Sequence, residues 1–98
     1  RPDNREIPKG IAMVAILTKF IGPTNFRGSR VKAFTTSGHR IIVPWDHALN
    51  VEENHDAAAI ALCRKMEWGG KLVRGGTDVG YAYTFLREWT VIDAGPEA

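Results

Sequence analysis

The strongest pattern of apolar positions lies in the middle of the chain, between residues 50 and 69. Apolar side chains recur there at the spacing of one helix face, at Val51, Ala58, Ala59, Leu62, Cys63 and Met66. Asn50 is a favourable N-cap, and Glu53 three residues later completes a variant of the capping box. Gly69 can supply a left-handed stop. We therefore predict one amphipathic helix from about Val51 to Trp68, with its apolar face buried against the rest of the chain.

Three stretches before this helix have the composition of β-strands. Residues 11–21 are apolar and partly β-branched, which favours a central or covered strand over a helix. Residues 29–36 alternate in the manner of a half-buried antiparallel strand. One face of this strand should carry Val31, Ala33 and Thr35, and the other Arg30, Lys32 and Phe34. Residues 39–43 form a third strand, which Pro44 ends.

Two more strands are expected after the helix. Residues 71–74 form a short strand, and the glycines of residues 75–80 form a turn. Residues 81–86 are aromatic and rich in β-formers, so they are expected to be a strand. The element order is therefore βββαββ. It predicts an α+β fold in which an antiparallel sheet carries one long helix packed on one face.

Length and composition indicate one domain. The chain has 98 residues, of which 44% are hydrophobic and 24% charged, ordinary values for a globular protein. We assign residues 13–90 to a single α+β domain. Residues 1–12 open with a polar stretch that contains two prolines, and they are expected to be a flexible N-terminal extension. Residues 91–98 are expected to be a C-terminal tail.

The single cysteine, Cys63, bears on the location of the protein. It excludes an intramolecular disulfide, which fits a reducing compartment, so we expect a cytoplasmic protein. Because Cys63 lies beside the apolar stripe of the predicted helix, we expect it to be buried like a small hydrophobic residue. Apolar runs fall well short of the ~18 residues of a membrane span, so no membrane partner is expected.

The net charge of +2 hides an uneven distribution along the chain. Residues 1–40 hold eight Lys and Arg and two acids, a net of +6. Residues 41–98 hold five Lys and Arg and nine acids, a net of −4. Between Glu6 and Asp46 there is no acidic residue. Such asymmetry indicates an anionic partner, and the alternative is a sheet face that carries solvated charges.

The basic half of the chain contains the best candidate for a binding surface. Arg30, Lys32 and Phe34 share one strand face, and cations interleaved with aromatic rings are typical of surfaces that bind single-stranded nucleic acid. The full candidate set is Lys19, Phe26, Arg27, Arg30, Lys32, Phe34 and Arg40. No RNP motif of an RNA-recognition domain is present. The alternative for Phe34 is packing against a neighbouring element.

The sequence supports an enzymatic function less well than it supports a binding function. His47 and His55 each stand beside an aspartate, but they lack the close paired spacing of usual zinc sites and are weak candidates for metal ligands. Cys63 and His55 would lie ~12 Å apart along the helix, too far for a nucleophile and its base. No G-x-S-x-G or P-loop motif occurs. We therefore expect no metal site and no other cofactor, and we favour a non-enzymatic role.

Several short motifs resemble a group of small uncharacterised proteins encoded by bacteriophages, plasmids and integrated elements of bacteria. The motifs are residues 18–25 (TKFIGPTN), 27–33 (RGSRVKA), 42–47 (IVPWDH) and 66–68 (MEW), and Gly75-Gly76 with Gly80-Tyr81. The resemblance covers roughly residues 13 to 86. Members of that group usually begin near the position of Met13, which implies that residues 1–12 are an addition. The resemblance implies an accessory protein of a mobile element and transfers no activity.

Three hypotheses about function follow. The first is a non-enzymatic interaction protein of a bacterial mobile element that binds a host protein. The second is a nucleic-acid-binding module that uses the basic first hairpin to bind DNA or RNA. The third, a small hydrolase or metal-binding enzyme, has the least support. The sequence does not fix the oligomeric state, and a small homo-oligomer is compatible with it.

Overall fold

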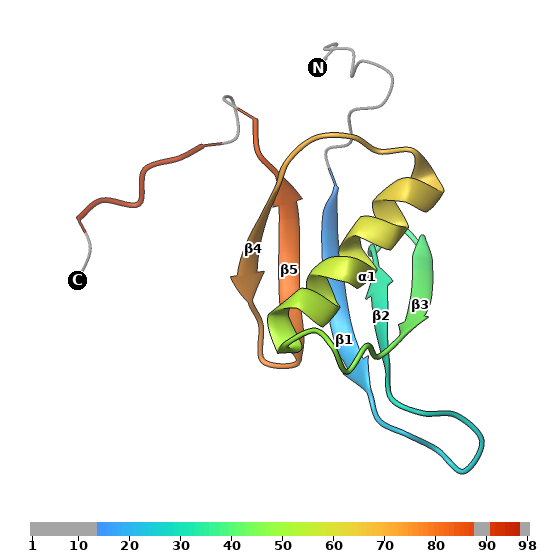
Figure 1. Cartoon of the computed structure of the whole chain (residues 1–98). Coiled ribbons are helices and arrows are strands. Elements are labelled where there is room, and N and C mark those ends of the chain that lie inside the picture. The colour runs from blue at the N-terminus through green and yellow to red at the C-terminus, as the bar shows by residue number, and fades with distance from the viewer. Residues whose placement is uncertain (1–13, 88–90, 97–98) are drawn as a thin grey trace.

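The computed structural model describes residues 14–87 and 91–96, and it confirms the predicted α+β fold in βββαββ order (Figure 1). Its elements are β1 (Ala15–Ile21), β2 (Arg30–Phe34), β3 (Arg40–Pro44), α1 (Val51–Met66), β4 (Leu72–Gly76) and β5 (Gly80–Phe85). The extension predicted for residues 1–12 lies outside the described residues. Residues 91–96 of the predicted tail are exposed and belong to no helix or strand.

All neighbouring strands of the sheet are antiparallel, in the order β3-β2-β1-β5-β4. The middle strand, β1, pairs with β2 on one side and with the last strand, β5, on the other. Helix α1 follows β3 at one edge and precedes β4 at the other, and it crosses one face of the sheet between them (Figure 1). The opposite face is therefore left without a helix in the described part of the chain.

The core lies between α1 and the sheet face that α1 covers. Its buried residues are Ile16, Val31, Ala33, Tyr83 and Phe85 from the sheet, and Ala58, Ala59, Leu62 and Cys63 from the helix. This confirms the predicted burial of Leu62 and Cys63. It also confirms the predicted inner face of β2, because Thr35, just after β2, is buried on the same side.

The predicted burial of the apolar stripe of α1 is wrong at two of its positions. Val51 is 52% exposed, and Met66 is only partly buried. The buried positions in the first half of the helix include the polar residues Asn54 and His55 instead. Both side chains form hydrogen bonds inside the fold, which removes most of the usual cost of burying a polar group. Hydrophobic periodicity alone does not detect such positions.

Helix α1 begins with the predicted capping box. The Asn50 side chain accepts a hydrogen bond from the Glu53 N–H at 2.8 Å, and the Glu53 carboxylate accepts one from the Asn50 N–H at 3.1 Å. The side-chain amide of the buried Asn54 donates to the carbonyl oxygens of Asp46, Leu49 and Asn50. The loop from β3 is therefore fixed to the first turn of the helix.

We expect Asn50→Ala to lower the free energy of unfolding by ~1 kcal/mol, because an N–H of the first turn loses its acceptor. Urea denaturation of the variant and the parent measures the difference. Glu53→Gln serves as a control with a smaller expected effect, since an amide oxygen can still accept from the Asn50 N–H. An unchanged denaturation midpoint for Asn50→Ala would contradict the assigned cap.

The end of α1 comes two residues earlier than predicted. The residue in the left-handed conformation is Glu67, with φ 61°, and not Gly69. The Glu67 N–H donates to the Arg64 carbonyl at 3.2 Å, and the Trp68 N–H donates to the Cys63 carbonyl at 2.9 Å, which is the Schellman pattern. This ending turns Trp68 back against the core. Burial of the indole offsets the roughly 1–2 kcal/mol that a left-handed residue other than glycine costs.

The last hairpin is also shifted from its predicted position. Gly75 and Gly76 belong to β4, and the turn is confined to residues 77–79. Gly80 begins β5, where a Cβ atom would collide with the carbonyl oxygen of Thr18 on β1. The prediction placed these glycines in a turn because a glycine-rich stretch between two strands is typical of a hairpin turn. It could not show that β5 needs a glycine for its close approach to β1.

Candidate nucleic-acid interface

The sheet face that α1 does not cover is the candidate interface, named here the open face. Its side chains alternate along each strand with those that point towards the helix. They are Ala15, Leu17, Lys19 and Ile21 on β1, Arg30, Lys32 and Phe34 on β2, Arg40, Ile42 and Pro44 on β3, Val73 and Gly75 on β4, and Gly80, Ala82 and Thr84 on β5. Ile42 and Val73 are 45% and 48% exposed. Apolar surface and charge therefore occur side by side on this face.

The strand register brings the predicted cations together on the open face. Lys19 on β1 lies directly opposite Lys32 on β2. In the next row Phe34 lies between Leu17 on β1 and Arg40 on β3. Like charges directly opposite each other destabilise a sheet. The Lys19–Lys32 pair therefore lowers the stability of the free protein.

Phe34 lies beside one of these lysines. The Lys32 Nζ atom lies 5.0 Å from the centroid of the Phe34 ring, a cation–π contact. Phe34 is partly exposed and is not part of the buried core. Because Lys32 has a long flexible stem, its ammonium group can move off the ring when another group takes its place.

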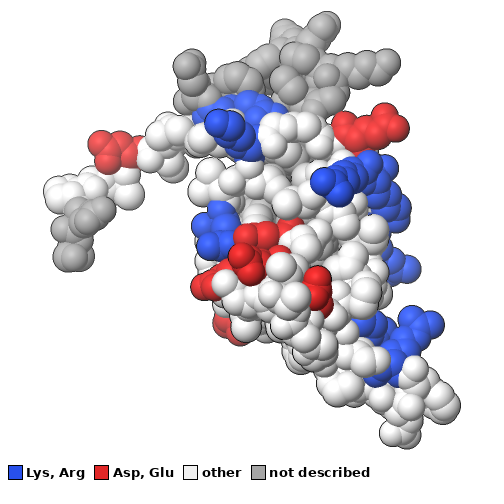
Figure 2. Space-filling model, viewed as in Figure 1, with Lys and Arg blue, Asp and Glu red and all other residues white. Residues whose placement is uncertain are grey.

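None of the open-face residues is acidic. Most acidic residues of the described ranges instead lie on α1 and on the segments next to it, at Asp46, Glu52, Glu53, Asp56 and Glu67. The other two, Asp78 and Asp93, lie in the turn between β4 and β5 and in residues 91–96. Figure 2 views the helix side and shows acidic side chains gathered around the first half of α1 and basic side chains along the side of β3. The division of charge along the sequence is therefore also a division in space, because β1, β2 and Arg40 at the start of β3 come from the basic half and α1 from the acidic half.

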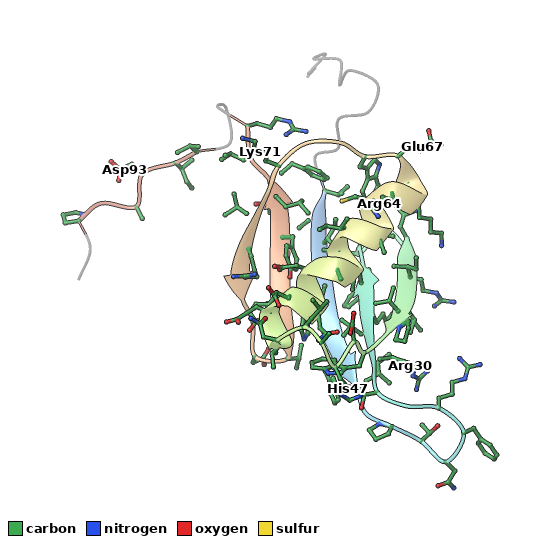
Figure 3. All side chains as sticks on the ribbon, in the orientation of Figure 1. Arg30, His47, Arg64, Glu67, Lys71 and Asp93 are labelled. Carbon is green, nitrogen blue, oxygen red and sulfur yellow. The ribbon has the colours of Figure 1, made fainter. Side chains whose placement is uncertain are left out.

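Two of the predicted candidates, Phe26 and Arg27, lie away from the sheet. They belong to the loop of residues 22–29, which extends beyond the ends of β1 and β2 (Figure 1). Figure 3 shows Arg30 where this loop enters β2. The predicted set therefore divides into five residues on the open face and two in this loop.

Sequence reasoning missed a polar cluster beneath α1. His55 Nδ1 and the Thr18 hydroxyl lie 2.7 Å apart in a buried hydrogen bond, and the Tyr81 N–H donates to the same hydroxyl at 3.3 Å. Burial lowers the pKa of the His55 imidazole, and the neighbouring Asp56 carboxylate opposes part of this shift. The imidazole is therefore neutral near pH 7 and joins α1 to β1 and β5. The sequence feature that could have indicated this cluster is Thr18, a polar residue within an apolar strand.

A second missed cluster lies between α1 and β4. The Asp56 carboxylate accepts hydrogen bonds from the Tyr83 hydroxyl at 2.6 Å and from the Arg74 guanidinium at 2.7 and 2.8 Å. Burial, followed by this hydrogen bond, raises the pKa of the Tyr83 phenol, which stays protonated. The three residues line an open groove of about 520 Å³. Because Asp56 and Arg74 already neutralise each other, this groove offers little net charge to a ligand.

The residues weighed for enzymatic chemistry do not come together. His47 is exposed in the loop before α1, whereas His55 is buried against Thr18. Within residues 14–87 and 91–96, no three His, Cys, Asp or Glu side chains are placed to hold a metal ion. Burial raises the pKa of the Cys63 thiol, which disfavours the thiolate that a nucleophile needs.

Comparisons of the chain with protein-family models, curated proteins and solved structures found no match. No helix in the described ranges is long and apolar enough to cross a membrane. The geometry and charge of the open face are therefore the basis for a functional proposal.

Proposed function

We propose that the protein binds single-stranded nucleic acid on the open face. The observation that carries this proposal is the Lys19–Lys32 pair, in which two cations lie directly opposite each other and one of them, Lys32, lies beside the ring of Phe34. Arg30 and Arg40 add positive charge in the rows on either side of the pair. Cations that follow phosphates, next to a ring that stacks on bases, are the combination that single-strand-binding surfaces use.

An anionic ligand gives a reason for the Lys19–Lys32 pair. The two ammonium groups repel each other in the free protein, and a phosphate bound between them replaces that repulsion with attraction. Phosphate contacts also release counterions from the nucleic acid, which adds to the affinity. A second copy that met this face with its own open face would bring like charges together, so the open face is a poor interface for self-association.

A single strand suits the open face better than a duplex. The sheet has five strands, which at about 4.8 Å between neighbours make a surface roughly 19 Å across. The major groove of B-DNA is about 12 Å wide and admits a helix or a two-stranded ribbon, but not a sheet of this width. A flexible strand can instead lie on the sheet and turn its bases towards it.

We expect two substitutions on the open face to affect binding in different ways. Lys32→Ala should weaken binding similarly for all sequences and reduce the slope of log K against log salt by about 0.7, because one phosphate contact is lost. Phe34→Ala should weaken binding about ten-fold through lost stacking, with the salt slope unchanged. Titration of a labelled oligothymidylate at several salt concentrations measures both effects.

Arg64→Ala is the matched control for charge. It removes one cation from α1, on the other side of the sheet, and should leave the affinity and the salt slope nearly unchanged. If the parent binds no single strand at low salt, the proposal is wrong. A host protein then becomes the leading candidate, with the exposed Ile42 and Val73 as apolar contacts. In either case, the motif resemblance leads us to propose an accessory role in a mobile element.

A further inference from the structure

The loop between β1 and β2 displays an aromatic ring on a fixed turn. Phe26 is 93% exposed. The Thr24 N–H donates to the Arg27 carbonyl at 2.7 Å, and the Thr24 hydroxyl accepts from the N–H groups of Phe26 and Arg27 at 3.2 and 3.0 Å. A single exposed apolar residue is common on protein surfaces. Phe26 differs because three hydrogen bonds hold its turn in shape and a cation stands next to it.

We infer that Phe26 is a second base-stacking site, and that a bound single strand runs along β2 from Phe34 to this loop. The inference rests on the proposed function of the open face and adds the path of the strand and the length of nucleic acid that is bound. Two aromatic rings with cations between them would hold the strand at both ends of that path.

The cations of the open face form a line in this direction. Arg40 lies in the row of Phe34, Lys32 lies in the next row, and Arg30 lies in the row after that. Successive rows are two residues apart, or ~6.6 Å along the strand, so the phosphates of an extended chain can contact them one after another.

The loop continues this line beyond the sheet. Arg27 stands next to Phe26 on the same turn. The Arg30 Nε atom donates to the Gly28 carbonyl at 3.2 Å, which joins the base of the loop to the start of β2. Arg27 therefore extends the series of cations on β2 into the loop that leads directly to it.

The path across the strands offers no comparable series. The open-face residues of β4 and β5 are Val73, Gly75, Gly80, Ala82 and Thr84, none of which is charged. A nucleic-acid strand that crossed from β3 towards β4 would lose its cationic contacts after β1. The distribution of charge therefore favours a bound nucleic-acid strand that runs along β2 over one that crosses the sheet.

The separation of the two rings sets a minimum length for the bound strand. Phe34 and Phe26 are eight residue steps apart along the chain, at most about 28 Å when extended. Residues 30–34 of β2 account for about 13 Å of this, and the loop continues past the end of β2 (Figure 1). A four-nucleotide strand has three steps of at most about twice the 3.4 Å rise of B-DNA, roughly 20 Å in all. Because residue 26 lies in the middle of a loop that continues past the end of β2, we expect the two rings to lie farther apart than dT4 spans, so that dT4 reaches one ring and dT12 reaches both.

Fluorescence anisotropy with labelled dT4 and dT12 tests this inference. Phe26→Ala should weaken dT12 binding about ten-fold and leave dT4 binding unchanged. The melting temperature should not change, because the ring supports no part of the core. Phe26→Trp should retain dT12 binding, and the added indole should show quenching by dT12 relative to the parent. Ile60→Ala, which truncates an exposed side chain on α1, should change neither affinity.

The outcomes separate this inference from the proposed function. If Phe26→Ala binds dT12 as tightly as the parent does, the second stacking site is wrong while binding on the open face stands. Equal weakening of dT4 and dT12 also overturns the inferred path, because it places Phe26 in the same short site as Phe34. If the parent binds neither oligonucleotide at low salt, the proposed function fails, and this inference fails with it.

Discussion

Leu62→Ala should lower the free energy of unfolding by ~2–5 kcal/mol. Leu62 is fully buried between α1 and the sheet, in one cluster with Ile16 and Val31. Truncation removes apolar surface from the core and leaves a cavity that the rigid sheet cannot fill. Because small domains are stable by only about 5–15 kcal/mol in total, this loss should shift the urea midpoint strongly.

Ile60→Ala is the matched control for this variant. Ile60 is on the same helix but is 44% exposed, so the same kind of truncation should cost less than ~1 kcal/mol. Circular dichroism during urea denaturation would measure both variants. If Leu62→Ala cost no more than Ile60→Ala, the assignment of the buried face of α1 would be wrong.

Gly80→Ala should lower stability by ~3 kcal/mol or more, which is at or above the upper end for overpacking. The added methyl group would collide with the carbonyl oxygen of Thr18, a backbone atom that cannot rotate away. Gly80 pairs with Lys19 in the register of β1 and β5. Relief of the collision would therefore have to separate these two strands, which form the middle of the sheet.

Gly75→Ala adds the same methyl group to the same hairpin and serves as the control. A Cβ atom at Gly75 would meet no other atom within 4 Å, so the change should stay within about 0.5 kcal/mol. Thermal unfolding followed by circular dichroism compares the two variants. Equal melting temperatures would contradict the close approach of β5 to β1.

The features predicted correctly from the sequence are those that local chemistry determines. The Asn50 capping box needs only residues within one turn of each other, and the inner face of β2 follows from strict alternation. The ends of elements were predicted less well. Glu67 takes the left-handed conformation because it turns Trp68 back onto the core, a tertiary effect that outweighs the local preference for glycine.

The candidate site was predicted in composition but not in arrangement. The sequence indicates that Lys19 and Lys32 belong to a basic region, but only the pairing of β1 with β2 places them opposite each other. The separation of Phe26 from the sheet depends on how far the loop projects, which no local pattern encodes. His55 and Thr18 are far apart in the chain, so their buried hydrogen bond could not be inferred from either residue alone.

The central position of β1 also determines when the sheet can be completed during synthesis. Its second neighbour in the sheet is β5, the last strand, and Ile16 pairs with Tyr83 near the other end of the domain. Contacts between residues so distant in sequence are slow to form, whereas the β1–β3 meander has short connections. Among the described strands β1 leaves the ribosome first, and one of its edges stays unpaired until β5 has been made. Throughout that interval the strand at the centre of the finished sheet is an exposed edge, open to pairing with a chaperone or with another nascent chain.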